Sequence, residues 1–213
     1  MPSLSFIAIV IVGICSIVFP IIFSFLVGGQ VSLYVSPPYS FADIPDLTGK
    51  VAIVTGCNTG IGYVTARELA RKGAKVIVAV RDDAKGKATI SRIKADLRDL
   101  PGANLLEYIK LDLSSFAVVR KFAKDFSYMR IKLDILILNA GMLTPSFGLT
   151  VDGLETHMGV NHFGHFLLVK LLTPIIKASK CRIVHVSSLA HNDPYPGGIN
   201  IESFTNGTGF SFL

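Results

Sequence analysis

Lysine and arginine are absent from the first 49 residues of this chain of 213, where Asp43 and Asp46 are the charged side chains. All 21 Lys and Arg residues lie from Lys50 onward, which makes the remainder of the chain basic. A basic surface suits nucleic acid, an anionic membrane face or a ligand that carries phosphate. The basic residues are dispersed over predicted helices without a nucleic-acid-binding motif, so we expect no nucleic acid partner.

Cysteine is scarce as well. Cys15, Cys57 and Cys181 lie in an apolar run, a glycine-rich loop and a predicted buried strand, a pattern that excludes a disulfide framework or zinc finger and fits a reducing compartment. Cys57 lies near a predicted helix N-terminus, which can activate a thiol, but a small side chain in a tight turn needs no redox role. His162 and His165 lack a third ligand, so we expect core histidines and no metal site.

Charged residues are also missing from the 22 residues between Phe6 and Val27. Because about 20 apolar residues cross a bilayer as a helix, this run predicts a transmembrane anchor over residues 1–28. A cleaved signal peptide is the alternative, but the run is long for one, no Lys or Arg precedes it and no small-residue cleavage site follows. Residues 29–48 contain several prolines and predict an extended linker.

Short β-branched runs alternate with amphipathic helical patterns over residues 49–198. The predicted strands are 50–55, 75–80, 105–111, 133–138 and 182–186, and the predicted helices include 84–97, 116–126 and 153–178. The alternation predicts an α/β fold, a doubly wound parallel sheet of the Rossmann type with about five strands. Ligands of such sheets bind at the carboxyl ends of the strands. Residues 199–213 match no element, and we expect an irregular tail.

A glycine-rich turn, TGCNTGIG, joins the first strand to the first helix. Its bare backbone lets a pyrophosphate approach the amides of the helix N-terminus, whereas three glycines without this context would mark an ordinary tight turn. The candidate cofactor-binding residues of the turn are Gly56, Asn58, Thr59, Gly60, Ile61 and Gly62. Asn58 and Thr59 could equally well shape the turn.

The glycine spacing, with Thr55 before it, resembles the short-chain dehydrogenase/reductase family. Further family positions follow in order: Asp112 and Leu113 after the third strand, the Asn139-Ala140-Gly141 turn, Asn161 in the long helix, and Ser187-Ser188. The resemblance covers about residues 47–195. The runs VNHFGHFLL and RIVHVSSLAH are most similar to the retinol dehydrogenase and WW-domain oxidoreductase branch.

Arg81 occupies the position after the second strand where an NAD enzyme would place an acidic residue on the ribose hydroxyls. A guanidinium there can pair with the 2′-phosphate of NADP(H) and stack on adenine, so we expect NADP(H) as the cofactor. Asp82, next in the sequence, leaves open an approach to the hydroxyls instead.

The resemblance implies four catalytic positions, of which two are visible. Ser188 matches the serine that orients the substrate oxygen, with Ser187 as the alternative, and Asn161 matches the helix asparagine. The Tyr and the Lys four residues later are not found, because the last lysine is Lys180. A second tyrosine candidate, Tyr195, lacks the cation that would lower its pKa from about 10.

One literal Tyr-x-x-x-Lys sequence runs from Tyr128 to Lys132. It precedes the fourth predicted strand, so we expect it at the amino ends of the strands, away from the cofactor. The family's sixth and seventh strands are also not found, and we expect one exposed sheet edge.

The resemblance therefore implies an NADP(H)-dependent oxidoreductase of lipophilic alcohols, aldehydes or ketones, retinoid-like or steroid-like, in the full-length relatives. We expect this chain, like a C-terminally truncated member, to be inactive alone. The alternative is a membrane-anchored NADP(H)-binding or interaction module without catalysis. We expect an endoplasmic reticulum anchor with the domain in the cytosol and the sequon at Asn206 unmodified. Oligomeric state stays open.

Overall fold

The structure, a computed structural model, describes residues 40–98, 100–189 and 198–209. The predicted anchor and most of the predicted linker lie outside these residues. Within the part of the chain that the structure describes, no helix is both long and apolar enough to cross a membrane. Residues 41–213 form one compact unit.

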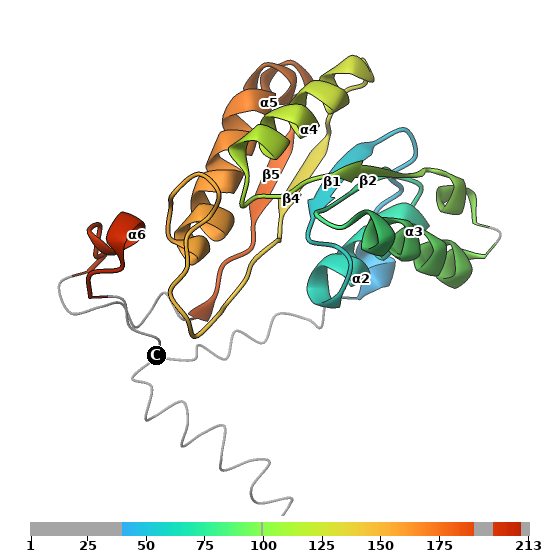
Figure 1. The fold of residues 1–213 in the computed structure, drawn as a ribbon. Helices are drawn as coiled ribbons and strands as arrows, with labels where there is room; N and C mark the ends of the chain where they lie inside the picture. Colours follow the sequence, from blue (N-terminus) through green and yellow to red (C-terminus); the bar gives the residue numbers. More distant parts are fainter. Residues whose placement is uncertain (1–39, 99, 190–197, 210–213) are drawn as a thin grey trace, which may run out of the picture. The chain divides into compact units, whose positions relative to one another are not determined.

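Strands and helices alternate along this unit as the sequence predicts (Figure 1). The strands are β1 (Val51–Thr55), β2 (Lys75–Val80), β3 (Leu106–Lys110), β4 (Ile135–Leu138) and β5 (Arg182–His185). The helices are α2 (Gly60–Arg71), α3 (Asp83–Leu97), α4 (Phe116–Tyr128), α5 (His165–Ser179) and α6 (Ser203–Asn206), with 3-10 turns η1 (Phe41–Asp43) and η2 (Pro101–Asn104) and a π-helix η3 (Met158–Gly164).

All four strand pairs are parallel, and the sheet order is β3-β2-β1-β4-β5. The chain moves outward from β1 to β3 and then returns to the other side of β1 to form β4. The strand order therefore reverses between β1 and β4, which is where ligands of doubly wound sheets bind. The predicted five-stranded parallel fold is confirmed.

Two apolar layers cover the two faces of the sheet. Successive strand side chains point to opposite faces, so Ala52 and Val54 pack in the cluster that holds α2 and α3, whereas Val51 and Ile53 pack in the cluster that holds α4 and α5. The second cluster contains the largest fully buried side chains, led by Phe122 and Phe126 of α4. Fully burying each such side chain stabilises the fold by about 1.5–3 kcal/mol.

Asp134 ties three strands together at the amino end of the sheet. Its carboxylate accepts hydrogen bonds from the Val51 N–H at 2.9 Å, Lys50 Nζ at 3.1 Å and Lys132 Nζ at 3.2 Å. Its main-chain oxygen accepts from the Arg182 N–H at 2.9 Å. Lys132 therefore lies at the amino ends of the strands, as predicted for the Tyr128–Lys132 sequence.

Two sequence predictions were wrong in detail. The long helix does not begin at residue 153, because Gly153 has a φ of +78° and an isolated bridge joins Leu149 to Glu155, so helical geometry starts later. The tail is not wholly irregular, since it contains α6. Phe204 of α6 meets Phe163 edge-to-face at a centroid distance of 6.1 Å. Four residues are too few to give a periodic pattern in the sequence.

Candidate functional site

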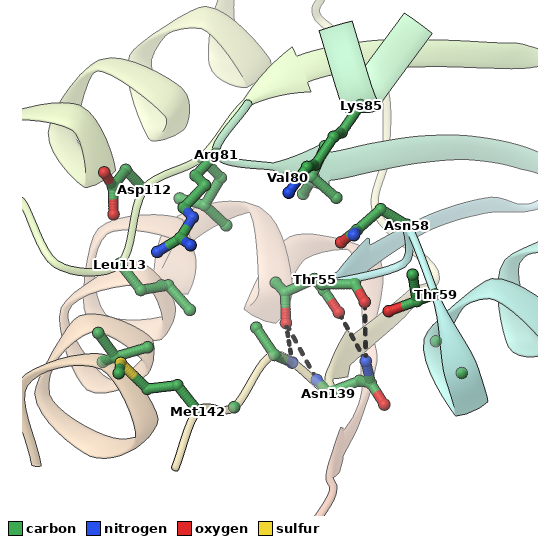
Figure 2. A pocket seen from close by; sticks show the side chains of 18 of the residues that line it. Thr55, Asn58, Thr59, Val80, Arg81, Lys85, Asp112, Leu113, Asn139 and Met142 are labelled. Atoms are coloured by element: carbon green, nitrogen blue, oxygen red, sulfur yellow. Dashed lines mark hydrogen bonds between the residues drawn. The ribbon is translucent and has the colours of Figure 1, made fainter. Parts of the chain in front are cut away.

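A cavity of about 630 Å³ opens at the carboxyl ends of β1, β2 and β4 (Figure 2). Its lining includes all twelve residues that the sequence predicts for the cofactor: Gly56, Asn58, Thr59, Gly60, Ile61, Gly62, Arg81, Asp112, Leu113, Asn139, Ala140 and Gly141. It also includes residues that the sequence prediction missed, among them Val80, Lys85, Met142 and Val186. The fold thus brings distant segments to the predicted place.

The glycine turn is shaped by close backbone approach. Gly56 has a φ of +66°, and a Cβ at this position would lie 2.7 Å from the Ala140 Cα. A Cβ at Gly62 would meet the Asn139 side chain and would lie 2.7 Å from the Gly56 oxygen. A Cβ at Gly60, which faces open space, would meet nothing within 4 Å. Space at the N-terminus of α2 therefore remains for an anion to reach the backbone amides.

Thr55 joins the end of β1 to the turn that follows β4. Its Oγ1 accepts hydrogen bonds from the Asn139 and Ala140 N–H groups, each at 3.0 Å (Figure 2). The Asn139 side chain returns two bonds, from Nδ2 to the Thr55 oxygen at 3.0 Å and to the Gly56 oxygen at 3.3 Å. These bonds fix the floor of the cavity at the point where the strand order reverses.

The opposite side of the cavity is basic. Figure 2 shows Arg81 and Lys85 across the cavity from Asn139, and both are exposed. Asp82 caps α3 instead, because its Oδ1 accepts the Lys85 N–H at 2.7 Å. The Asp82 carboxylate is thus engaged by the helix, while Arg81 and Lys85 offer two cations. Lys85 follows Arg81 by four residues, and this spacing is a sequence signal that could have identified Lys85 as a second cation of the cavity.

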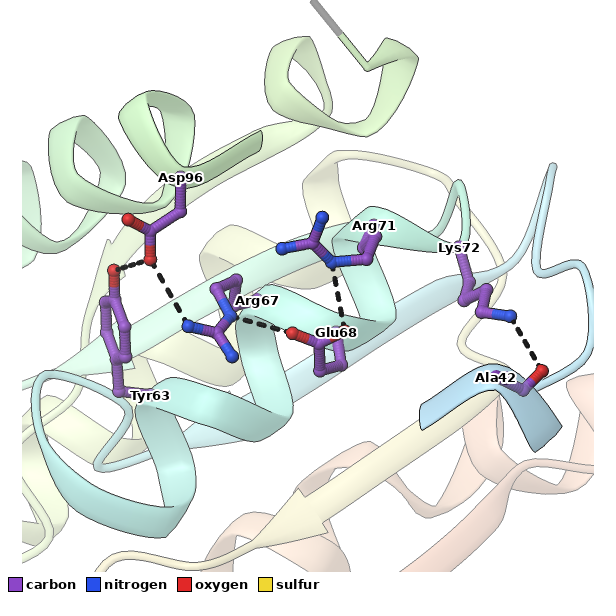
Figure 3. Close-up of polar contacts among 7 residues, drawn as sticks. All are labelled: Ala42, Tyr63, Arg67, Glu68, Arg71, Lys72 and Asp96. Carbon is purple, nitrogen blue, oxygen red and sulfur yellow. Dashed lines mark hydrogen bonds and ion pairs between the residues drawn. The ribbon is translucent and has the colours of Figure 1, made fainter. Parts of the chain in front are cut away.

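Helix α2 is anchored by a polar network along its length (Figure 3). Glu68 is 4 % exposed, and its two carboxylate oxygens accept from Arg67 Nε at 2.7 Å and Arg71 Nε at 3.0 Å. Tyr63 donates to Asp96 of α3 at 2.8 Å. This hydroxyl is the first cause that lowers the pKa of Asp96 below its usual value. The network fixes the helix whose N-terminus faces the cavity.

The predicted catalytic residues Asn161 and Ser188 come shortly after Val160 and Val186 in the sequence. Asn161 binds the Met142 backbone in both directions, with Oδ1 accepting at 2.9 Å and Nδ2 donating at 3.0 Å. Ser188 is exposed and follows the end of β5 by three residues. Neither residue lines the cavity, but Val160 and Val186 do. The roles of Asn161 and Ser188 remain predictions.

The predictions for histidine and cysteine had mixed outcomes. His165 is buried, as expected, and burial is the main cause that lowers its pKa. The assignment of His162 to the core was wrong, because this residue lies on the solvent side of the helix and is exposed. Its ring stacks on that of Phe166, with the ring centroids 6.4 Å apart. Burial raises the pKa of Cys57 to about 12, which argues against a reactive thiol. Among the described residues, no three potential ligands could hold a metal ion.

The fold and the site define a dinucleotide-binding α/β protein, with a glycine turn, a basic end and a strand-order reversal at one cavity. The family model for short chain dehydrogenase matches residues 50–200. The chain belongs to that family, as its resemblance indicated.

Relatives and solved structures agree with this assignment. Retinol dehydrogenase 12 of Mus musculus is 43 % identical over 87 % of this chain and 56 % of its own, and polyprenol dehydrogenase of Mus musculus is 43 % identical over 70 % and 44 %. A crystal structure of an uncharacterised Mycobacterium paratuberculosis protein has a TM-score of 0.60 at 43 % identity and covers 72 % of this chain and 51 % of that one.

A metagenomic short-chain oxidoreductase in complex with NADP has a TM-score of 0.59 at 31 % identity, over 72 % of this chain and 68 % of that one. The chain spans about half the length of the curated relatives it matches.

Proposed function

We propose that this chain binds NADP(H) in the cavity at the carboxyl ends of β1, β2 and β4. The observation that carries the proposal is the meeting of the glycine turn with Arg81 and Lys85 in one cavity. The amides at the start of α2 suit a pyrophosphate, and the two cations suit a 2′-phosphate. The NADP complex of the structurally similar metagenomic oxidoreductase supports this choice.

The other residues of the cavity complete the assignment. Asp112 and Leu113 would contact the adenine, and the segment from Asn139 to Gly141 would hold the nicotinamide half, because the dinucleotide crosses the point where the strand order reverses. Bound NADPH supplies a hydride, whereas the chain supplies the positions that orient the cofactor.

We further propose that longer proteins of this kind are NADP(H)-dependent oxidoreductases of lipophilic alcohols, aldehydes or ketones, retinoid-like or steroid-like. The names of the retinol and polyprenol dehydrogenase relatives support this substrate class. In such a protein Ser188 would orient the substrate oxygen and Asn161 would support proton transfer. The 213-residue chain alone, which carries no Tyr-x-x-x-Lys after Ser188, would bind cofactor without turnover.

The apolar run from Phe6 to Val27 supports a membrane anchor. The resemblance to the family and the free cysteines favour the endoplasmic reticulum membrane, with the domain in the cytosol. A glycan on Asn206 would contradict that orientation. A membrane-anchored binding or interaction module without catalysis is the second candidate. The mostly exposed strand β5, which is last in the sheet order, favours it.

The decisive experiment is calorimetric binding of NADPH and NADH to the full chain, kept in mild detergent because of its apolar N-terminal run. We expect NADPH to bind more tightly, and Arg81→Ala to weaken NADPH about tenfold or more with little effect on NADH, since a lost charged hydrogen bond costs about 1.5–3 kcal/mol. Arg98→Ala, outside the cavity lining, is the control. Equal affinity for both cofactors, unchanged by Arg81→Ala, would refute the 2′-phosphate assignment.

A further inference from the structure

The segment that follows β4 is held almost entirely by side chains from elsewhere. The Asn139 and Ala140 N–H groups donate to Thr55 Oγ1. The Met142 N–H donates to Asn161 Oδ1, and the Thr144 N–H donates to His157 Nε2 at 2.9 Å. The structure of this segment, which supplies part of the cavity lining, therefore depends on its partners.

Two of these contacts, those of Met142 and Thr144, come from one helical stretch, in which His157, Asn161 and His165 are spaced by four residues. Residues four apart are neighbours on a helix surface. Asn161 lies within the π-helix η3, a rare geometry that is frequent at functional sites. One helical row thus bonds Met142 and Thr144 directly, and its third member, His165, contacts Thr55.

Hydrogen-bond roles fix the tautomer of His157. Nε2 must accept, because the Thr144 N–H can only donate. The proton is then on Nδ1, which donates to Glu155 Oε1 at 2.7 Å. Glu155 is 3 % exposed and also accepts the Met158 N–H at 2.9 Å. A buried carboxylate therefore orients the imidazole that holds Thr144.

The same reasoning applies to His165, which is 3 % exposed. Its Nδ1 donates to the Asn161 carbonyl oxygen at 3.1 Å, and its Nε2 lies 3.0 Å from Thr55 Oγ1. Since that hydroxyl already accepts two N–H groups, it donates its own proton to Nε2. His165 thus links the helix backbone, through Thr55, to the start of the segment.

We propose that His157 and His165 are positioning residues that hold the segment 139–144 in the form that receives the nicotinamide half of the cofactor. The proposal rests on the proposed function. Both imidazoles act through other groups, Thr144 and Thr55, and neither lines the cavity. Removing His157 leaves the Thr144 N–H without its acceptor, and removing His165 leaves the Thr55 hydroxyl without its acceptor. Either loss loosens one half of the site and leaves the basic half intact.

The test compares two ligands in calorimetry with the full chain. NADPH probes the whole cavity, whereas 2′,5′-ADP probes the end with Arg81 and Lys85. We expect His157→Leu and His165→Leu to weaken NADPH binding about tenfold, because each leaves one donor shielded from water without its acceptor, and to leave 2′,5′-ADP binding within about twofold. His157→Gln, which keeps an acceptor, restores much of the affinity. His162→Leu, an exposed histidine of the same stretch, is the matched control.

Thr55→Val removes the hydroxyl at nearly constant volume, and with it both the contact to His165 and the acceptor of the Asn139 and Ala140 N–H groups. It therefore tests the whole link from His165 to the segment if His165→Leu fails to fold. The proposal would be overturned if NADPH affinity were unchanged in His157→Leu and in whichever of His165→Leu and Thr55→Val folds. It would also be overturned if these variants lost affinity equally for NADPH and for 2′,5′-ADP. Wild-type chain that binds neither ligand would overturn the proposed function as well, which separates the two failures.

Discussion

Substitutions of single glycines can distinguish effects on protein stability from effects on cofactor binding at this site. Gly60 has a φ of +56° and open space around its missing Cβ. We expect Gly60→Ala to cost about 1–2 kcal/mol of stability, the penalty for a left-handed residue, yet to abolish NADPH binding because the new methyl occupies the space for the pyrophosphate. Thermal unfolding and calorimetry measure the two effects.

Gly56→Ala is the comparison, because its Cβ would lie 2.7 Å from the Ala140 Cα and would disturb the fold itself. Gly49→Ala, at a φ of +75° with nothing within 4 Å and outside the cavity, is the control for backbone strain alone. Gly60→Ala protein that binds NADPH as tightly as the Gly49→Ala protein would show that the pyrophosphate lies elsewhere.

Lys85 is the second cation of the basic end. We expect Lys85→Ala to weaken NADPH about three- to tenfold, less than Arg81→Ala, because an ammonium makes a point contact whereas a guanidinium binds phosphate with two parallel bonds. NADH affinity, measured in the same titrations, should hardly change. Lys87→Ala, also exposed on α3 but outside the cavity lining, is the matched control. Equal losses from both lysines would indicate only long-range attraction by the basic surface.

The twelve residues predicted for the cofactor all line the cavity, because a glycine turn and strand ends carry local signals in the sequence. The sequence prediction missed His157 as a structural contact and assigned His165 only to the core, because their partners, Thr144 and Thr55, become neighbours only in the folded chain. His162 and His165 look alike in the sequence, yet one is exposed and the other buried. A period of three or four residues cannot resolve which side of a helix meets the sheet when both sides are apolar.

At the scale of elements, Asp134 makes sheet stability depend on pH. Burial alone would raise its pKa, but bonds from the Val51 N–H, Lys50 and Lys132 outweigh burial and lower the pKa. A folded pKa below the unfolded value of about 3.9 means that the contribution is complete above about pH 5 and is lost as the pH falls through the folded pKa.

We therefore expect Asp134→Asn to lower the free energy of unfolding at pH 7 by about 1–3 kcal/mol and to flatten its decline between about pH 5 and pH 2. Urea unfolding across this pH range measures both. Asp125→Asn, which removes an exposed helix pair with Lys121, is the control and should cost about 0.5 kcal/mol or less. If the free energy of unfolding of Asp134→Asn fell with decreasing pH as steeply as that of the wild type, the pH dependence would belong to other carboxylates.

Strand and helix types followed from the sequence, but several bounds did not. Leu133 is fully buried like a strand residue, yet β4 begins only at Ile135. The Leu133 N–H donates instead to Ser179 Oγ at 3.2 Å, a contact between distant segments. The start of the long helix was equally unpredictable, because the bridge at Glu155 competes with helix formation there. Such tertiary contacts decide where an element begins.

At the scale of the whole molecule, the two end strands of the sheet differ in how far they are exposed. β3 is one end of the sheet order and β5 the other, and β5 is the more exposed strand, as the prediction of an open edge implied. Val184 and Val186 are 39 % and 44 % exposed. An exposed strand at the end of a sheet suits pairing with further protein. The activity of this chain alone is therefore predicted separately from that of longer relatives.

We expect the full 213-residue chain to bind NADPH and yet to reduce no lipophilic aldehyde. Under the proposed function Ser188 orients the substrate oxygen, but proton transfer also needs a phenol whose pKa a nearby cation brings down from about 10. Such transfer contributes about 10²–10⁴-fold to rates. Tyr128 is 70 % exposed at the end of α4, and Lys132 pairs with Asp134 at the amino ends of the strands. Tyr128 and Lys132 therefore do not serve as the proton donor and its cation. Tyr195 lies outside the described residues.

The measurement is NADPH oxidation at 340 nm with retinaldehyde in detergent, with mouse retinol dehydrogenase 12 as the positive control for the assay. A chain that binds NADPH in calorimetry but shows no oxidation above the protein-free rate fits a cofactor-binding half without its proton donor. Turnover would contradict this, and Tyr195→Phe and Tyr128→Phe would then identify the donor. Loss of turnover in Tyr195→Phe alone would mean that a tyrosine without a downstream lysine can serve, and that the cation comes from elsewhere in the chain.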